Sequence, residues 1–151
     1  MQERSSVRQC DIALETNADK EMTLLHIVVE EYLAPSNLAK LDLSFAVCII
    51  YLIDGTNVNE VDAAIFLNSL FTNPQFLENP APVLLAVNKS DLKNCKFNTD
   101  VYDAIEREVG KLRGDEKYTF KKYAPCTVYS MNCSALMNNL RIILEFIGAC
   151  V

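Results

Sequence analysis

The sequence is poor in glycine and histidine, which excludes several kinds of functional site. Only four of its 151 residues are glycine and one is histidine, and there is no tryptophan. One histidine leaves no credible Ser-His-Asp or Cys-His catalytic set. The six cysteines contain no C-x-x-C pair, so they indicate neither a zinc site nor a disulfide framework. We therefore expect reduced cysteines, as in a cytosolic protein.

The few glycines also form no phosphate-binding loop. Such a loop needs the pattern G-x-x-x-x-G-K-[ST], because glycines allow consecutive backbone N–H groups to close on the phosphates. The pair Gly110-Lys111 lies within a helical pattern, lacks the earlier glycine and is followed by Leu112. No phosphate lysine and no Mg²⁺-binding hydroxyl can therefore be assigned.

Positive charge and long apolar runs are scarce as well. The net charge of −6 argues against direct nucleic-acid binding, which needs a surplus of Lys and Arg. The longest apolar run, residues 43–53, is too short to cross a bilayer and predicts a buried strand. We therefore expect no membrane span and no signal peptide in this chain.

What is present, from Val47 onward, is an alternation of apolar runs with segments of helical spacing. Strands are predicted at 47–53, 83–87 and 126–131, and helices at about 61–71 and 98–113, the second capped by Asn98 or Thr99 and stopped by Gly114. This pattern predicts an α/β fold, a parallel sheet with helices on both faces. The last helix is predicted from the spaced apolar residues Leu136, Leu140, Ile143, Leu144 and Ile147.

Two segments give weaker signals. Residues 22–29 predict one more strand, and residues 30–41 an irregular or helical passage interrupted by Pro35. The charged stretch 115–122, with interleaved aromatic residues, is interpreted as a solvated loop. A partner-docking surface is the alternative.

The tetrapeptide Asn88-Lys89-Ser90-Asp91 follows the predicted strand 83–87 and matches the N-K-x-D guanine motif. Guanine presents two adjacent donors, N1–H and the exocyclic amine, and the Asp91 carboxylate can accept from both. The stem of Lys89 can lie along the base, and the Asn88 amide can join neighbouring loops. A polar turn after a strand is the alternative interpretation.

A second segment strengthens the guanine interpretation. Cys133-Ser134-Ala135 follows the strand predicted at 126–131, and small residues there would let backbone N–H groups reach the base O6. The order and spacing of the two loops, each at the end of its own strand, favour a joint base site. Neither His26, a lone histidine in an apolar run, nor Asp54, at the end of a strand, is assigned a chemical role.

With these residues in place, the chain resembles the beta subunits of the signal recognition particle receptor, small GTPases related to the Arf and Sar families. The resemblance covers about two thirds of the chain and includes the Glu106–Arg113 helix ending, which generic small GTPases lack. It rests on the stretches 50–55, 62–67, 82–92, 105–113 and 133–135.

The resemblance implies a GTP-binding subunit on the cytosolic face of the endoplasmic reticulum membrane, where it holds the receptor alpha subunit during co-translational targeting. The ribosome and the translocon are further candidate partners. Family members also have a membrane anchor, a phosphate loop and an acidic D-x-x-G turn. The corresponding strand here, Thr23-Leu24-Leu25, continues into His26 instead of an acid.

We therefore expect residues 1–46 to be a divergent remnant of the switch region and early strands, and 47–151 to be the guanine-base half of an N-terminally incomplete GTPase-like domain. The chain is expected to be either a fragment, or a degenerate copy that is cytosolic if complete. Weak or lost GTP binding and no hydrolysis are predicted, with Mg²⁺ only in a longer form. An Arf-like traffic GTPase fragment and an interaction module without nucleotide are the alternatives.

Overall fold

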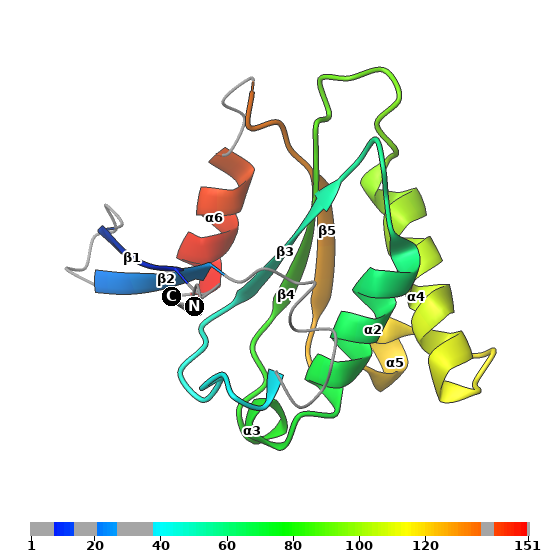
Figure 1. Cartoon of the computed structure of the whole chain (residues 1–151), viewed down its shortest axis with the longest axis horizontal. Helices are drawn as coiled ribbons and strands as arrows, with labels where there is room; N and C mark the ends of the chain where they lie inside the picture. The colour runs from blue at the N-terminus through cyan, green and yellow to red at the C-terminus, as the bar shows by residue number, and fades with distance from the viewer. Residues whose placement is uncertain (1–7, 14–20, 27–37, 137–140, 151) are drawn as a thin grey trace, which may run out of the picture.

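The computed structural model describes residues 8–13, 21–26, 38–136 and 141–150 (Figure 1). Its middle layer is a parallel sheet in the order β3-β4-β5, formed by β3 (Ile49–Asp54), β4 (Val83–Asn88) and β5 (Val128–Asn132). Residues 83–87 of the central strand are fully buried, as expected for a strand covered on both faces. The three strands predicted after residue 46 are confirmed to within two residues.

Helices cover both faces of this sheet. α2 (Glu60–Phe71) and α4 (Asn98–Arg113) pack on one face, and α6 (Arg141–Cys150) lies on the other (Figure 1). Alternation along β4 separates the two cores, because Leu85 belongs to the cluster with α2 and α4, whereas Leu84 packs with Ile143 and Phe146 of α6. The predicted three-layer GTPase-like fold is confirmed.

Two short helices were not predicted from the sequence. α3 (Pro74–Glu78) begins at Asn73, whose side chain accepts a hydrogen bond from the Phe76 amide. α5 (Phe120–Tyr123) lies in the stretch that was predicted to be a solvated loop. That prediction is wrong, because Phe120 is 2% exposed and its ring makes edge contacts with Phe71 and Tyr102 at centroid distances of 6.1 and 5.2 Å.

The ends of α4 test two further predictions. Gly114 stops the helix as predicted, in the left-handed conformation with φ of 67°. The predicted cap is wrong, since Phe97 occupies the N-cap position without a side-chain hydrogen bond. Asn98 instead donates from Nδ2 to the Ser130 backbone oxygen and Oγ, at 3.1 and 2.9 Å, so a tertiary contact replaced the local one.

The last predicted helix does not include its first apolar residue. α6 is described over Arg141–Cys150, and Leu136 lies in a turn before it with 82% of its surface exposed, so Leu136 is not part of the helical stripe. Leu140 lies outside the described residues. Among the described ranges, no helix is long and apolar enough to cross a membrane.

Before residue 47 the structure contains a hairpin and part of the core. β1 (Arg8–Ala13), which was not predicted, pairs antiparallel with β2 (Glu21–His26) in a two-stranded sheet of its own. The strand predicted at 22–29 is thus found as far as His26, and 27–29 lie outside the described residues. Leu38, Leu41 and Leu43 are buried with the main core. The domain division after residue 46 stays a prediction.

Candidate functional site

The candidate site is formed by three loops at one edge of the sheet. Parallel strands end at the same edge, so the segments after β3, β4 and β5 meet there, at the top of Figure 1. The predicted residues lie at the ends of two strands: Asn88 is the last residue of β4, with Lys89 and Asp91 directly after it, and Cys133, Ser134 and Ala135 follow β5. The sheet topology therefore brings all six residues together.

Side chains of the β4 loop bind directly to the β5 loop. The Ser134 hydroxyl donates to Asp91 Oδ1 at 2.5 Å, and the Ala135 amide donates to Asn88 Oδ1 at 3.0 Å. Ser134 is 2% exposed and Cys133 is fully buried, whereas Asp91 is exposed. A hydrogen bond to an ionised carboxylate is stronger than one between two neutral groups, so the bond from Ser134 orients the Asp91 side chain.

Backbone hydrogen bonds lock the same two loops in register. The Cys133 amide donates to the Val87 oxygen at 2.8 Å, and the Ser90 amide donates to the Cys133 oxygen at 3.0 Å. These bonds continue the β4–β5 ladder past the strand ends, so the motif is held by the sheet itself.

Lys89 connects the motif to the third loop. Its Nζ forms a 2.6 Å ion pair with Asp54 Oδ2, and its backbone has φ of 67°, the left-handed region that non-glycine residues rarely adopt. Asp54 Oδ1 accepts from the amide and hydroxyl of Thr56, at 3.0 and 2.7 Å. The bonds from Lys89 and Thr56 lower the pKa of the Asp54 carboxyl to about 2.

Sequence reasoning left Asp54 without a role in the site. The pair spans 35 positions of sequence, and no local pattern joins an acid after one strand to a lysine after the next. The available signal was the strand order, because an acid at the end of β3 must lie beside the residue that ends β4. The register pairs Asp54 with Asn88.

Gly55 lets the β3 loop approach the others closely. A Cβ atom there would lie 2.3 Å from Cys95 Sγ and 2.7 Å from the Asn88 backbone oxygen. The Gly55 amide donates to that same oxygen at 3.1 Å, and its own oxygen accepts from the Lys96 amide at 2.9 Å. The turn after β3 is thereby fitted between the motif and the segment that leads into α4.

Asn132 braces the opposite side of the site. Its Oδ1 accepts from the Asn98 amide at 2.9 Å, and its Nδ2 donates to the Lys96 backbone oxygen at 3.1 Å. Cys95, which lies between these segments, has its thiol pKa raised by burial. A raised pKa disfavours the thiolate, the reactive form of cysteine, and Cys95 packs against the main core.

The polar groups at this edge of the sheet fit a purine base better than a phosphate. The exposed carboxylate of Asp91 can accept from the two adjacent donors of guanine, and the Asn88 amide and Ala135 amide lie beside it. The lysine of the motif is engaged with Asp54, and no glycine loop accompanies it in the sequence. The residues present thus fit the base of a nucleotide and offer no assigned phosphate ligands.

Comparisons with known proteins agree with this architecture. The family model described as signal recognition particle receptor beta subunit matches residues 4–133. The signal recognition particle receptor subunit beta of Dictyostelium discoideum is 38% identical over 82 residues, which are 53% of this chain and 28% of the relative. The chain thus aligns with little more than a quarter of that relative's length.

Solved structures share the fold. The mammalian signal recognition particle receptor matches over 100% of this chain and 86% of its own, with a TM-score of 0.78 and 19% identity. The receptor SRb with GDP and Mg from Chaetomium thermophilum matches over 69% of this chain and 61% of its own, with a TM-score of 0.56 and 19% identity. The family match also favours the beta-subunit interpretation over an Arf-like fragment. The chain belongs to the family of signal recognition particle receptor beta subunits.

Proposed function

We propose that this chain acts as a beta subunit of the signal recognition particle receptor. It recognises a guanine base through Asn88, Lys89, Asp91, Cys133, Ser134 and Ala135, and binds the receptor alpha subunit at the endoplasmic reticulum membrane. The observation that supports the proposal most directly is the contact between Ser134 and Asp91, which orients the acid at the edge of the sheet. The relative solved with GDP and Mg supports a guanine nucleotide as the ligand class.

The binding is proposed to be weak and selective for the base. Phosphate and Mg²⁺ contacts are charge-assisted and supply much of nucleotide affinity, and the sequence offers no loop for them. Base contacts alone are therefore expected to give weak binding, and a dissociation constant on the order of 1 mM would correspond to about −4 kcal/mol. Without phosphate and Mg²⁺ ligands, we expect no hydrolysis of GTP.

Saturation-transfer NMR with guanosine and adenosine tests the base site. Guanosine is expected to bind and adenosine is not, because adenine lacks the adjacent donor pair that Asp91 accepts. Calorimetry with GTP tests whether nucleotide binding is weak, since micromolar or tighter affinity would refute that proposal.

A change of ligand preference tests the role of Asp91 itself. In Asp91→Asn the new amide can donate to the carbonyl that xanthine carries in place of the guanine amine, so preference should move from guanosine to xanthosine. Asp100→Asn is the matched control, because Asp100 is an exposed acid in the first turn of α4. Unchanged guanosine binding in Asp91→Asn would exclude the proposed base contact.

Binding of the purified receptor alpha subunit tests the partner separately from the ligand. Wild type and Asp91→Asn are compared by calorimetry in the presence of guanosine. Binding that is lost in Asp91→Asn supports coupling between the base site and the partner surface. Equal binding of both forms favours the interaction module that functions without nucleotide, and no binding of either refutes the proposed partner.

A further inference from the structure

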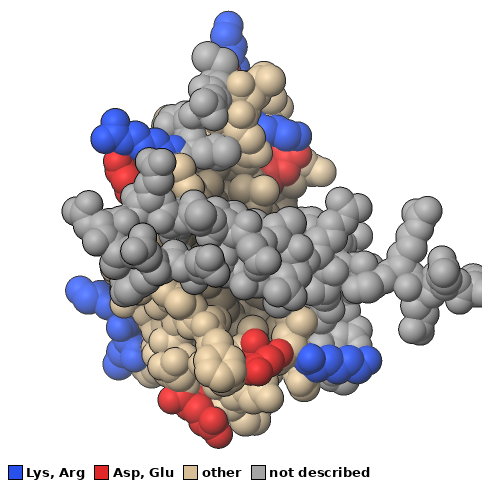
Figure 2. All heavy atoms as spheres, turned by 90° about the vertical axis from the view of Figure 1, so that its left-hand side faces the viewer, with Lys and Arg blue, Asp and Glu red and all other residues tan. Residues whose placement is uncertain are grey.

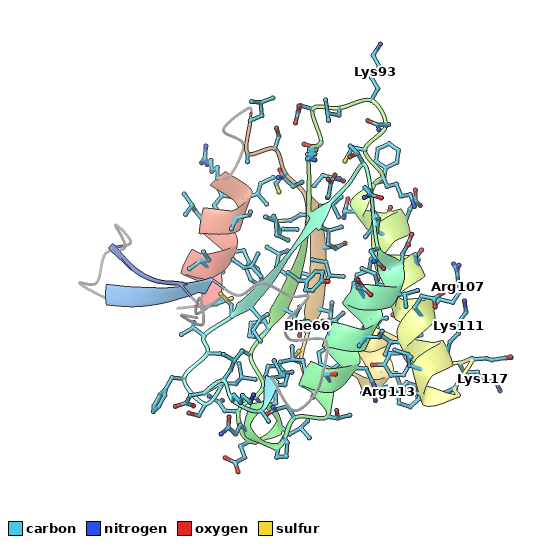
Figure 3. All side chains as sticks on the ribbon, viewed as in Figure 1. Phe66, Lys93, Arg107, Lys111, Arg113 and Lys117 are labelled. Carbon is cyan, nitrogen blue, oxygen red and sulfur yellow. The ribbon has the colours of Figure 1, made fainter. Side chains whose placement is uncertain are left out.

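Positive side chains gather over the C-terminal half of α4 and over α5. They lie away from the segments 88–91 and 133–135, which are proposed to bind guanine and which we call the guanine loops. Figure 3 shows Arg107, Lys111, Arg113 and Lys117 on one side of the molecule, while Lys93 projects from its far end. We call this set, with the two lysines of α5, the cation surface, and all of its members are exposed: Arg107, Lys111, Arg113, Lys117, Lys121 and Lys122.

The cation surface opposes the charge of the rest of the chain. Residues 107–122 contain six of the fourteen Lys and Arg residues but only three of the twenty Asp and Glu residues. This segment therefore carries +3, and the remainder carries −9. On the face seen in Figure 2, by contrast, positive and negative side chains lie close together around the rim.

Part of the cation surface is rigidly held. Arg113 donates from Nε to Asn68 Oδ1 at 2.9 Å, and its guanidinium lies 5.0 Å from the centroid of the Tyr118 ring. Tyr118 in turn stacks on Tyr123 at 5.6 Å, with Lys122 Nζ 4.9 Å from the Tyr123 centroid. Cations stacked on aromatic rings keep a defined orientation while they remain charged and exposed.

Other members are available to a ligand. The side chains of Arg107, Lys117 and Lys121 make no hydrogen bond or ion pair within the described ranges, although the Lys117 backbone amide donates to Asp115 Oδ1 at 2.9 Å. Arg107 and Lys111 also line a hollow of about 640 Å³, together with Glu116 and the buried Tyr118. Lys111 forms an ion pair with Glu108 at 2.5 Å, so Arg107 is the cation of this hollow whose side chain has no partner within the described ranges. A concave site with one such cation at its edge can hold an acidic side chain and its neighbours.

We propose that the cation surface binds an acidic segment of a protein chain. The carboxylates of Glu108, Asp115 and Glu116 lie among the cations, so a ligand whose acids are separated by neutral residues fits better than one of uniform charge. A long nucleic acid or an anionic bilayer would extend beyond the cation surface. It would then meet the negatively charged remainder of the chain, which would repel it. This interaction is independent of nucleotide and goes beyond the proposed function.

Fluorescence anisotropy with a labelled dodecapeptide of alternating glutamate and alanine tests the proposal on the full chain. The peptide is expected to bind at 50 mM salt, with affinity that falls as salt rises because the surface charges are screened. Lys117→Glu should weaken binding about tenfold. Lys93→Glu is the matched control, since it makes the same change in net charge at an exposed lysine far from the surface.

Equal weakening by Lys117→Glu and Lys93→Glu would overturn the proposal, because it would reduce the effect to net charge. So would the absence of peptide binding. Tighter binding of a twelve-residue uridine RNA, or of vesicles containing phosphatidylserine, would assign the surface to a different class of partner. Far-UV circular dichroism and urea midpoints establish that both variants are folded.

Discussion

The guanine loops and the cation surface differ in whether their polar side chains contact other residues of the chain. At the loops, each motif side chain contacts another loop: Asn88 the Ala135 amide, Lys89 the Asp54 carboxylate, and Asp91 the Ser134 hydroxyl. On the cation surface, the side chains of Arg107, Lys117 and Lys121 have no hydrogen-bond or ion-pair partner within the described part of the chain. The first region holds its polar side chains in fixed positions, as the proposed base site requires, and the second leaves charged side chains exposed, as the proposed acidic partner requires.

The largest expected effect removes the support beneath the cation surface. Phe120→Ala should lower the free energy of unfolding by about 3–5 kcal/mol, because a fully buried aromatic ring leaves a cavity among Phe71, Tyr102 and Tyr118. Phe45→Ala is the control, at a phenylalanine that is 86% exposed, and should change stability by less than about 0.5 kcal/mol. Urea denaturation measures both, and similar losses would contradict the burial of Phe120.

A second change disturbs the packing of the guanine loops. Gly55→Ala should destabilise the fold by about 1–3 kcal/mol, because the new methyl group would collide with the Asn88 backbone oxygen and Cys95 Sγ. Gly148→Ala has open space around it and lies in α6, where replacing glycine should stabilise by up to about 1 kcal/mol. Thermal melts should therefore shift in opposite directions. An unchanged or raised melting temperature in Gly55→Ala would argue against the close approach at Gly55.

A third change removes one bond between the loops. Ser134→Ala should cost about 1–2 kcal/mol, because it deletes a buried hydroxyl that donates to Asp91. Ser44 donates to Asp42 in the same chemical arrangement at an exposed position, so Ser44→Ala should cost less than about 0.5 kcal/mol. Equilibrium unfolding measures the loss of stability in each of the two variants. Guanosine binding should weaken only in the Ser134 variant.

The smallest effect is a pH dependence at the edge of the site. The pKa of Asp54 is lowered from 3.8 to about 2 in the folded chain, so its ionised form favours folding. That contribution is complete above about pH 4 and is lost as the pH falls toward 2. Asp54→Asn should remove this part of the profile, which urea midpoints between pH 2 and 5 would reveal. Identical profiles for both proteins would exclude the Asp54–Lys89 pair as the cause.

The parts of the fold that were predictable are those encoded within a few neighbouring residues. The runs at 47–53 and 83–87 are continuous and apolar, which indicates a strand covered on both faces, and both became strands of the sheet. Gly114 ends α4 because glycine adopts the left-handed conformation without strain. The two guanine motifs follow strand ends, so the α/β topology alone predicts that they meet.

The features that were missed depend on distant partners. Asn98 was expected to cap α4, but Ser130, 32 positions away, takes its side chain. Phe120 lies in a charged stretch and is buried by Phe71 and Tyr102, which no local window contains. The link between Asp54 and Lys89 was likewise invisible in either segment alone. In each case tertiary packing overrode a local preference.

The burial of β4 has a consequence for the motion of the motif that follows it. Residues 83–87 lie between two strands and under helices on both faces, so their amides should exchange with solvent only when the whole domain opens. Residues 89–91, which come directly after that strand, are exposed. The rate of hydrogen exchange should therefore rise within a few residues after β4, except at Ser90, whose amide donates to the Cys133 oxygen. Ligand binding should be visible as added protection on the exposed side of that boundary.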